Sequence, residues 1–348
     1  DFPPAGNFKT AKGPRDVHML RRGDVLQPLK SAAPGALSCM NELDARFKLE
    51  QPDDEGLRRA ALARWLTDDR NVLTWRSIVN RIWQHHFDRG LVTTPNDFGR
   101  MGDKPSHPEL LDWLAVTFRD DFAGSFKKLH KLIVTSTVYM QASDHDESNA
   151  KIDSENRLLW RMNRPRLDAE QVRDAVVMLT GKLDLTMGGP SVKQFIETKG
   201  IHVTPNVDYA GFDPDAPANY RRSIYRFMFR TVPDPLMDAL DCPDLSQLAP
   251  KRTVSITAQQ ALSMLNSRFL TRQYEHIAAR IEREDGPKAK GQGTEDAVAR
   301  QVSRLYQLAL GRTPSDEELK TVCEYDAKHG LANAVRVIIN SNEFMFVP

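Results

Sequence analysis

The sequence is poor in cysteine, has no long apolar run and carries no excess of either charge. Its 348 residues include only 3 cysteines and no C-x-x-C pair, which excludes thiol redox motifs and zinc ribbons. The absence of C-x-x-C-H excludes a covalently attached c-type haem in this chain. No segment approaches the ~18 apolar residues of a membrane span. Since 48 Lys and Arg against 47 Asp and Glu leave only +1, we expect neither a transmembrane segment nor a nucleic-acid partner.

Familiar catalytic and phosphate-binding motifs are missing as well. The absence of G-x-S-x-G and H-E-x-x-H argues against esterases and zincins. The glycine turn at 188–191 lacks the strand-to-helix context of a phosphate-binding loop. Residues 144–147, Asp-His-Asp-Glu, could hold a cation but lack the full EF-hand spacing, so a solvated loop is the alternative.

What is present is typical of a folded, globular chain. The hydrophobic share is 40% and the charged share is 27%, both ordinary values. At about 150 residues per domain, the length favours about two domains. The start, Asp1-Phe2-Pro3-Pro4, leads us to expect a piece of a longer protein or a processed product.

Helical patterns dominate from residue 55 onward. Apolar residues recur at helical spacing over 55–68, and Thr74 is the predicted N-cap of a helix over 75–89 that ends at Gly90. Ser125 is a candidate cap for a further helix, and three short helices are predicted over about 295–310, 315–328 and 331–341. Capping patterns mark four helix starts, at Ser106 to Glu109, Asp168 to Gln171, Thr257 to Gln260 and Ser315 to Glu318.

The predicted fold is mainly α, a helical body with an extended N-terminal arm and a small β-containing insert near 185–230. A short β-like piece spans Val17 to Leu20, and Ile224 to Phe229 is the best strand candidate. We expect one intertwined body rather than separable domains, because the polar breaks at 143–154 and 284–294 are short. Its predicted parts are an arm packing on the body (1–54), a helical subdomain (55–142), an Arg-rich helix with the insert (143–256) and a C-terminal helical subdomain (257–348).

The densest chemical segment spans residues 80–109. Imidazole and carboxylate groups bind first-row metals and transfer protons, and the candidates of these types are His85, His86, Asp97 and His107. However, the adjacent His85 and His86 point about 100° apart on a helix, so both rarely bind one ion. Asp97 can close an Asx-type turn, and Glu109 belongs to a predicted capping box. A structural network or a ligand-binding surface is therefore the alternative to a metal or acid–base site.

A second cluster is rich in arginine. Guanidinium groups bind carboxylate, sulfate and phosphate, and a Trp ring stacks on a sugar or on an Arg, which suits an anionic polysaccharide. The alternative is a set of salt bridges to the nearby acids at 153, 155, 168 and 174. The predicted ligand-binding residues are Arg157, Trp160, Arg161, Arg164 and Arg166, with Arg173 nearby and Arg100 in the preceding segment.

Taken together, several stretches resemble a planctomycete-type domain of unknown function found in large cytochrome-associated proteins. The resemblance runs from about residue 15 to 346. The stretches that carry it include Arg21–Asp24, Ala61–Asp68, Val79–Phe87, Pro105–Ala115, Asn156–Arg161, Arg166–Glu170, Met187–Ser191, Arg221–Tyr225 and Asn340–Phe344.

The resemblance implies an exported, extracytoplasmic protein of polysaccharide-degrading bacteria. Its partners would be upstream domains of the same polypeptide, namely a second domain of unknown function and a cytochrome c domain that carries any haem. The family supplies no catalytic residues to carry over to this chain. Two hypotheses follow, and the sequence leaves both open. One is a module that acts as a scaffold or binds acidic glycan, without a cofactor of its own. The other is a sugar-active oxidative or lytic enzyme that uses the His/Asp residues and could hold a divalent metal.

Overall fold

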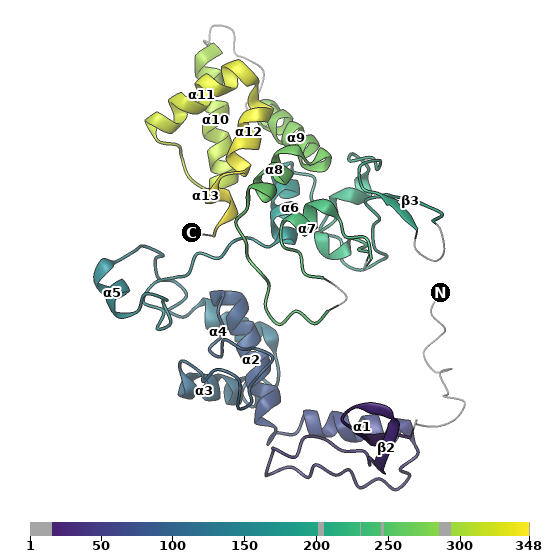
Figure 1. Cartoon of the computed structure of the whole chain (residues 1–348). Helices are drawn as coiled ribbons and strands as arrows, with labels where there is room; N and C mark the ends of the chain where they lie inside the picture. Colours follow the sequence, from purple (N-terminus) through teal and green to yellow (C-terminus); the bar gives the residue numbers. More distant parts are fainter. Residues whose placement is uncertain (1–15, 201–204, 230, 245–246, 285–293, 348) are drawn as a thin grey trace. The chain divides into compact units, whose positions relative to one another are not determined.

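The computed structural model describes residues 16–200, 205–229, 231–244, 247–284 and 294–347 (Figure 1). As the sequence predicts, this part of the chain is mainly helical, with thirteen α-helices and two small two-stranded sheets. The chain divides into two compact units, Asp1–Ala142 with Asp146–Met162 and Ser143–His145 with Asn163–Pro348. Within the described ranges, no helix has the length and apolar character needed to span a bilayer. The first fifteen residues of the predicted arm and most of the predicted break at 284–294 lie outside these ranges.

The first unit begins with a β-hairpin and a mostly exposed helix. Strands β1 (His18–Arg21) and β2 (Asp24–Ser31) pair antiparallel, which agrees with the β-like piece predicted at Val17 to Leu20. Arg22 and Gly23 join the strands with φ of 52° and 81°, the positive values that suit a tight hairpin turn. Helix α1 (Glu55–Leu66) follows, but only Trp65 of its predicted apolar face is buried.

The core of the first unit lies between three helices, α2 (Val72–Phe87), α3 (Pro108–Arg119) and α4 (Phe126–Val134), and α5 (Glu147–Ile152) follows them. Its buried residues include Val79, Trp83, Phe87, Leu111, Leu114, Phe118, Leu129 and Ile133. The fully buried amide of Asn80 holds the loop after α2, because its Nδ2 donates to Val92 O (2.9 Å) and its Oδ1 accepts from Val92 N (2.8 Å). This clamp fixes the start of the segment that carries Asp97 and His107.

Three of the predicted boundaries around α2 and α3 are wrong. Asn71, not Thr74, caps α2, because its side chain accepts from Thr74 N and its Nδ2 donates to Trp65 O (3.0 Å). The helix ends at Asp88, which takes a left-handed φ of 61°, two residues before the predicted stop. The predicted capping box at Ser106 to Glu109 does not form, because α3 begins one residue later behind His107 with Pro108 in its first turn. The predicted cap of α4 at Ser125 is confirmed.

The second unit has a larger helical core. The predicted capping boxes at Asp168, Thr257 and Ser315 are confirmed, and Gly311 and Gly330 separate the predicted C-terminal helices. Helices α9, α10, α11 and α12 pack against one another (Figure 1). In chain order the helices of this unit are α6 (Ala169–Leu179), α7 (Pro235–Ala239), α8 (Ala258–Asn266), α9 (Arg268–Glu284), α10 (Thr294–Leu310), α11 (Asp316–His329), α12 (Leu331–Ile339) and α13 (Asn342–Met345).

The small β-containing insert is present, but its strands are not where we expected the best one. Strands β3 (Ile196–Thr198) and β4 (Asn206–Asp208) pair antiparallel with Glu197 opposite Val207. The predicted strand at Ile224 to Phe229 is wrong, because the chain there forms the 3-10 turn η2 (Ser223–Tyr225), shortly after η1 (Pro217–Tyr220). Ser223 donates from N (2.8 Å) and Oγ (2.7 Å) to Asp174 of α6, and the strand-like pairing of the predicted segment is limited to a parallel bridge between Arg226 and Val192.

Candidate functional site

The structure brings only one of the predicted catalytic residues into a cluster. His86 Nε2 lies 2.8 Å from Nδ1 of His130 on α4, and its ring meets the edge of Tyr139 at a centroid distance of 5.5 Å. His85 is exposed on the neighbouring face of α2, as expected for adjacent helical residues. Burial, and then the nearby His130 and His85, lower the pKa of His86, so its imidazole is neutral at neutral pH.

The other two predicted catalytic residues have local structural contacts. His107 Nδ1 lies 3.0 Å from the hydroxyl of Ser106. Asp97 Oδ1 accepts from Gly99 N (2.8 Å), which is the expected Asx-type turn. Among the residues that the structure describes, no bond or ring contact joins either side chain to His86. No group of three His, Cys, Asp or Glu side chains in these ranges could hold a metal ion.

The predicted arginine cluster is divided between the two units. Arg157, Trp160 and Arg161 belong to the first unit, where the Arg161 guanidinium lies 5.2 Å from the centre of the Trp160 ring. Arg164 and Arg166 belong to the second unit, where Arg164 Nε donates to the Ser143 hydroxyl (2.9 Å). Arg100 is exposed in the loop between α2 and α3.

Arg166 is held by the fold itself. Its side chain is 4% exposed and lies 3.1 Å from the carboxylate of Asp241. It also donates to Leu240 O (2.9 Å), to the Gln260 side chain (3.1 Å) and to Ser255 O. These bonds tie the chain before α6 to the segment that joins α7 and α8.

A cavity of about 480 Å³ in the second unit combines cationic, amide and aromatic side chains. Its walls come from segments far apart in the sequence: α6, the parts of the insert before β3 and after β4, α7, α8 and the start of α9. The charged residues that line it are Arg173, Arg226, Asp234 and Arg268, and the aromatic ones are Tyr209, Phe212 and Phe269. Gln194, Gln259, Ser263 and Asn266 add hydrogen-bonding groups.

Arg173 reaches the cavity from α6 and is 1% exposed. Its Nη1 donates to Arg221 O (3.0 Å) and contacts Asp174 Oδ1 (3.1 Å), and its guanidinium lies 5.0 Å from the centre of the Phe269 ring. Burial, and then the charge of Arg226, lower its pKa to about 10, so the group keeps its proton at neutral pH. The aromatic contact and the carbonyl acceptor stabilise a cation far from water.

Arg226 is the second buried cation, with a side chain 6% exposed. Its Nη2 donates to Asp234, whose other carboxylate oxygen caps α7 by accepting from Leu236 N and Met237 N. The Nε and Nη1 of Arg226 and the Nε of Arg173 are buried and have no hydrogen-bond partner. The Nε atoms of Arg161, Arg166, Arg221 and Arg336 are unpaired in the same way, so what distinguishes this cavity is that two incompletely bonded guanidinium groups line it. An unpaired buried donor costs about 1–3 kcal/mol, which an anionic or carbonyl oxygen in contact with it would offset.

Electrostatically, the cavity favours an anion. Three guanidinium groups line it against the single carboxylate of Asp234. The exposed Arg268, at the start of α9, adds a charge accessible from solvent. The tilted rings of Phe212 and Phe269, 6.2 Å apart, supply an apolar surface beside these charges. The arrangement can bind an acidic group together with a flat or ring-shaped apolar face.

Sequence reasoning missed most of this cavity. Arg173 was noticed as part of the arginine cluster, whereas Arg226 was assigned to an expected strand. The one signal in the sequence is an arginine placed inside the apolar stretch from Ile224 to Phe229. Such a residue is buried only when it is paired, which the contact with Asp234 explains.

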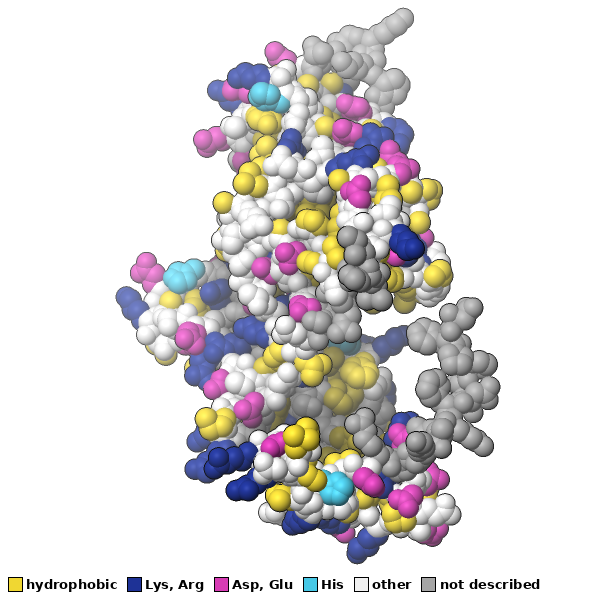
Figure 2. All heavy atoms as spheres, turned by 45° about the vertical axis from the view of Figure 1, so that its right-hand side comes forward, with side chains coloured by type: hydrophobic (Ala, Val, Ile, Leu, Met, Phe, Trp, Pro, Cys, Tyr) yellow, Lys and Arg dark blue, Asp and Glu magenta, His cyan; other side chains and the backbone are white. Residues whose placement is uncertain are grey.

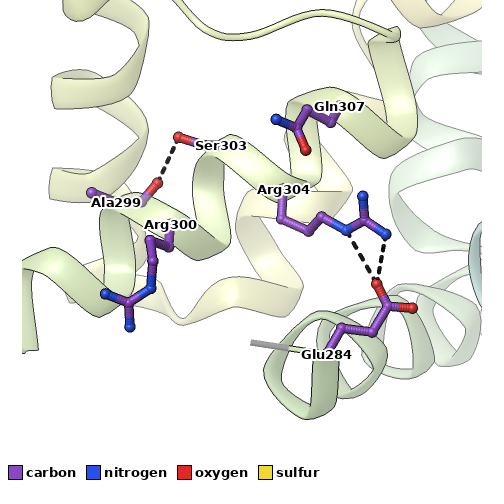
Figure 3. Close-up of a pocket in the computed structure, with 6 residues that line it drawn as sticks. All are labelled: Glu284, Ala299, Arg300, Ser303, Arg304 and Gln307. Carbon is purple, nitrogen blue, oxygen red and sulfur yellow. Dashed lines mark hydrogen bonds and ion pairs between the residues drawn. The ribbon is translucent and has the colours of Figure 1, made fainter. Parts of the chain in front are cut away.

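A second surface hollow, of about 410 Å³, is lined by α10 and the end of α9 (Figure 3). Arg304 donates to Glu284 from Nε (3.1 Å) and Nη2 (2.8 Å), and Ser303 donates to Ala299 O of its own helix (2.8 Å). These groups are satisfied by the fold, so we place the candidate site in the Arg173–Arg226 cavity. On the face that Figure 2 shows, Lys and Arg side chains lie among Asp and Glu, in line with the net charge of +1.

Comparison with known proteins gives one match. The model of a family described as "Protein of unknown function (DUF1553)", PSD1, matches residues 58–325, more than half of the 348-residue chain. No curated protein and no solved structure matches. The matched range includes every charged residue of the cavity.

Proposed function

Because the chain belongs to the PSD1 family of proteins of unknown function (DUF1553), a description that assigns no activity, we propose a function from the cavity: the chain is a binding module for acidic carbohydrate. The observation that carries the proposal is the set of three buried guanidinium nitrogens without acceptors, two on Arg226 and one on Arg173. A carboxylate or sulfate oxygen supplies the missing acceptor and neutralises the excess positive charge.

The rest of the cavity fits a sugar that carries such a group. Sugar hydroxyls exchange hydrogen bonds with amides such as Gln259 and Asn266, and a pyranose face packs against an aromatic ring such as Phe269. A volume of about 480 Å³ lies within the usual range for small-molecule sites. The same acidic group could be a uronic carboxylate or a sulfate ester, so a binding experiment must separate these two sources.

The test is binding of the purified chain to a polyuronate, a sulfated galactan and a neutral glucan of similar length. We expect binding to at least one acidic polymer, no binding to the glucan, and loss of binding in Arg226→Gln. Since Arg226→Gln alters a buried ion pair, Arg268→Gln, which removes an exposed cavity charge, serves as the second variant. Failure to bind any acidic polymer would contradict the proposal.

The wider setting is also a proposal, and the resemblance described above supports it. In this proposal the module is exported and extracytoplasmic, and it belongs to a cytochrome-linked multidomain protein of planctomycete-type, polysaccharide-degrading bacteria. Its partners are then the upstream domains of the same polypeptide. Co-purification of the chain with separately expressed upstream domains tests this arrangement, and its absence under all ionic conditions would count against a scaffold role.

The second candidate is a sugar-active enzyme with a base in the first unit. The favouring observation is the neutral, partly buried His86, which shares a hydrogen bond with His130 and can accept a proton. A His86→Ala variant should then lose turnover of acidic oligosaccharides while keeping the fold. Unchanged turnover, or no turnover in the wild type, would eliminate this candidate.

A further inference from the structure

A further cavity, of about 820 Å³, lies in the same unit as the Arg173–Arg226 cavity and is distinct from the hollow of Figure 3. We call it the second cavity; it is lined by α6, η2 and the segment before α8. Among the described residues, Arg226 is the one side chain that lines both this cavity and the Arg173–Arg226 cavity. Its guanidinium therefore forms part of the wall between two hollows. The unpaired Nε and Nη1 of Arg226 can therefore meet a ligand in either cavity.

The acids of the second cavity are already paired within the fold. Glu170 accepts from Arg252 with both carboxylate oxygens, at 2.6 and 3.0 Å. Asp174 accepts from the backbone and hydroxyl of Ser223 and contacts Arg173. The side chain of Arg222, by contrast, is exposed and makes no hydrogen bond or ion pair within the described ranges, where only its backbone carbonyl is bonded, to Tyr225 N. The third acid of this cavity, Asp168, lies 3.5 Å from Nε of Arg252. With the three acids paired, the charged groups left to meet a ligand are the unpaired Arg222 and the incompletely bonded Arg226.

The shape of a guanidinium explains how Arg226 can serve two ligands. Its planar group offers two forked edges, one formed by Nε and Nη2 and the other by Nη1 and Nη2. Nη2 is bonded to Asp234, while Nε and Nη1 lack acceptors. Because Nε and Nη1 belong to different edges, one carboxylate cannot take both in a forked pair. Two acceptors are needed to complete the hydrogen bonding of this side chain.

We propose that the second cavity is a second anion subsite, built on Arg222 and Arg226, which takes a carboxylate or sulfate of the same class as the first. This inference rests on the proposed function and extends it from one acidic group to two. Since both subsites draw on the charge of Arg226, an anion in the first weakens binding in the second. Acidic ligand is then bound in two unequal steps.

The experiment is equilibrium dialysis of the full chain against labelled methyl glucuronoside, with methyl glucoside as the neutral competitor. The wild type should bind two glucuronosides per chain, with the second dissociation constant at least several-fold higher than the first. Arg222→Gln should bind one, because the exposed Arg222 is removed without touching the buried Arg226–Asp234 pair. Arg283→Gln, an exposed arginine of α9 outside both cavities, should still bind two.

The outcomes separate the two proposals. One glucuronoside per chain in both the wild type and Arg222→Gln overturns the second subsite and leaves the proposed function standing. Two equal sites that Arg222→Gln does not change also overturn it. No glucuronoside bound by the wild type overturns both.

Discussion

Arg226 donates from Nη2 to the carboxylate of Asp234, and both side chains are largely buried, at 6% and 12% exposed. Asp234 in turn caps α7, so one carboxylate orients a helix start and a cation together. The pairing leaves Nε and Nη1 of Arg226 without acceptors. A fold that positions a buried cation firmly but satisfies it only in part has the character of a preformed anion site.

This ion pair predicts a large stability effect. Arg226→Met leaves Asp234 buried without its partner and should lower the free energy of unfolding by about 3–5 kcal/mol. Asp234→Asn keeps an acceptor for the cap of α7 but leaves the guanidinium uncompensated. Denaturant unfolding of both single variants and the double variant measures the coupling. The double variant should lose clearly less than the sum of the two, and strict additivity would show that the pair does not interact.

A second prediction concerns the loop that carries Asp97 and His107. Asn80→Ala removes two hydrogen bonds and leaves the buried N–H and C=O of Val92 unpaired, which should lower the free energy of unfolding by about 2–4 kcal/mol. Chemical denaturation checks this value, with Gln84→Ala on the same helix as the control. A loss of unfolding free energy below about 0.5 kcal/mol would mean that water replaces both hydrogen bonds between Asn80 and Val92.

A substitution at Gly90 tests the same contacts, because Gly90 lies against both Asn80 and Val92. A Cβ at this position would lie 2.6 Å from Val92 O and 2.8 Å from Asn80 Nδ2. Gly90→Ala should therefore destabilise the protein, and Asn80→Ala should partly relieve the clash in the double variant. A Gly90→Ala variant as stable as the wild type would contradict the observed contact.

A third prediction is a pH dependence from His86. The pKa of His86 in the folded protein lies below its usual 6.5, mainly because of burial. As the pH falls below about 6.5, the unfolded chain takes up a proton that the folded protein does not, so stability is lost until the folded pKa is passed. His86→Gln removes this contribution, and its unfolding free energy should fall less than that of the wild type between pH 7 and 5. Parallel curves would contradict the prediction.

The helical part of the fold was readable from local signals. Capping boxes at Asp168, Thr257 and Ser315 depend on residues three apart, so the sequence contains all of their information. The expected box at Ser106 failed because His107 and Pro108 shift the start of α3 by one residue. The expected strand at Ile224 failed because Ser223 bonds to Asp174, 49 residues earlier, and Ile224 is left 75% exposed.

The candidate site was much less accessible to sequence reasoning. Arg173, Arg226, Asp234 and Arg268 come together only through the packing of α6, α7 and α9 around the insert. Conversely, Arg166 resembled a ligand-binding residue because its acceptors, such as Leu240 O and Ser255 O, are carbonyls that carry no sequence signature. The division of the chain into four segments stays a prediction, as do the roles given to His85, Asp97, His107, Arg100 and Arg157.

The most direct test of the central claim compares two ligands that differ only in the acidic group. Isothermal titration of the full chain with methyl glucuronoside and with methyl glucoside isolates the carboxylate. The account predicts binding of the glucuronoside alone, weakened about tenfold or more in Arg268→Gln and unchanged in Arg283→Gln, since only the first variant alters the cavity. Equal affinity for both sugars, or equal effects of the two substitutions, would contradict it.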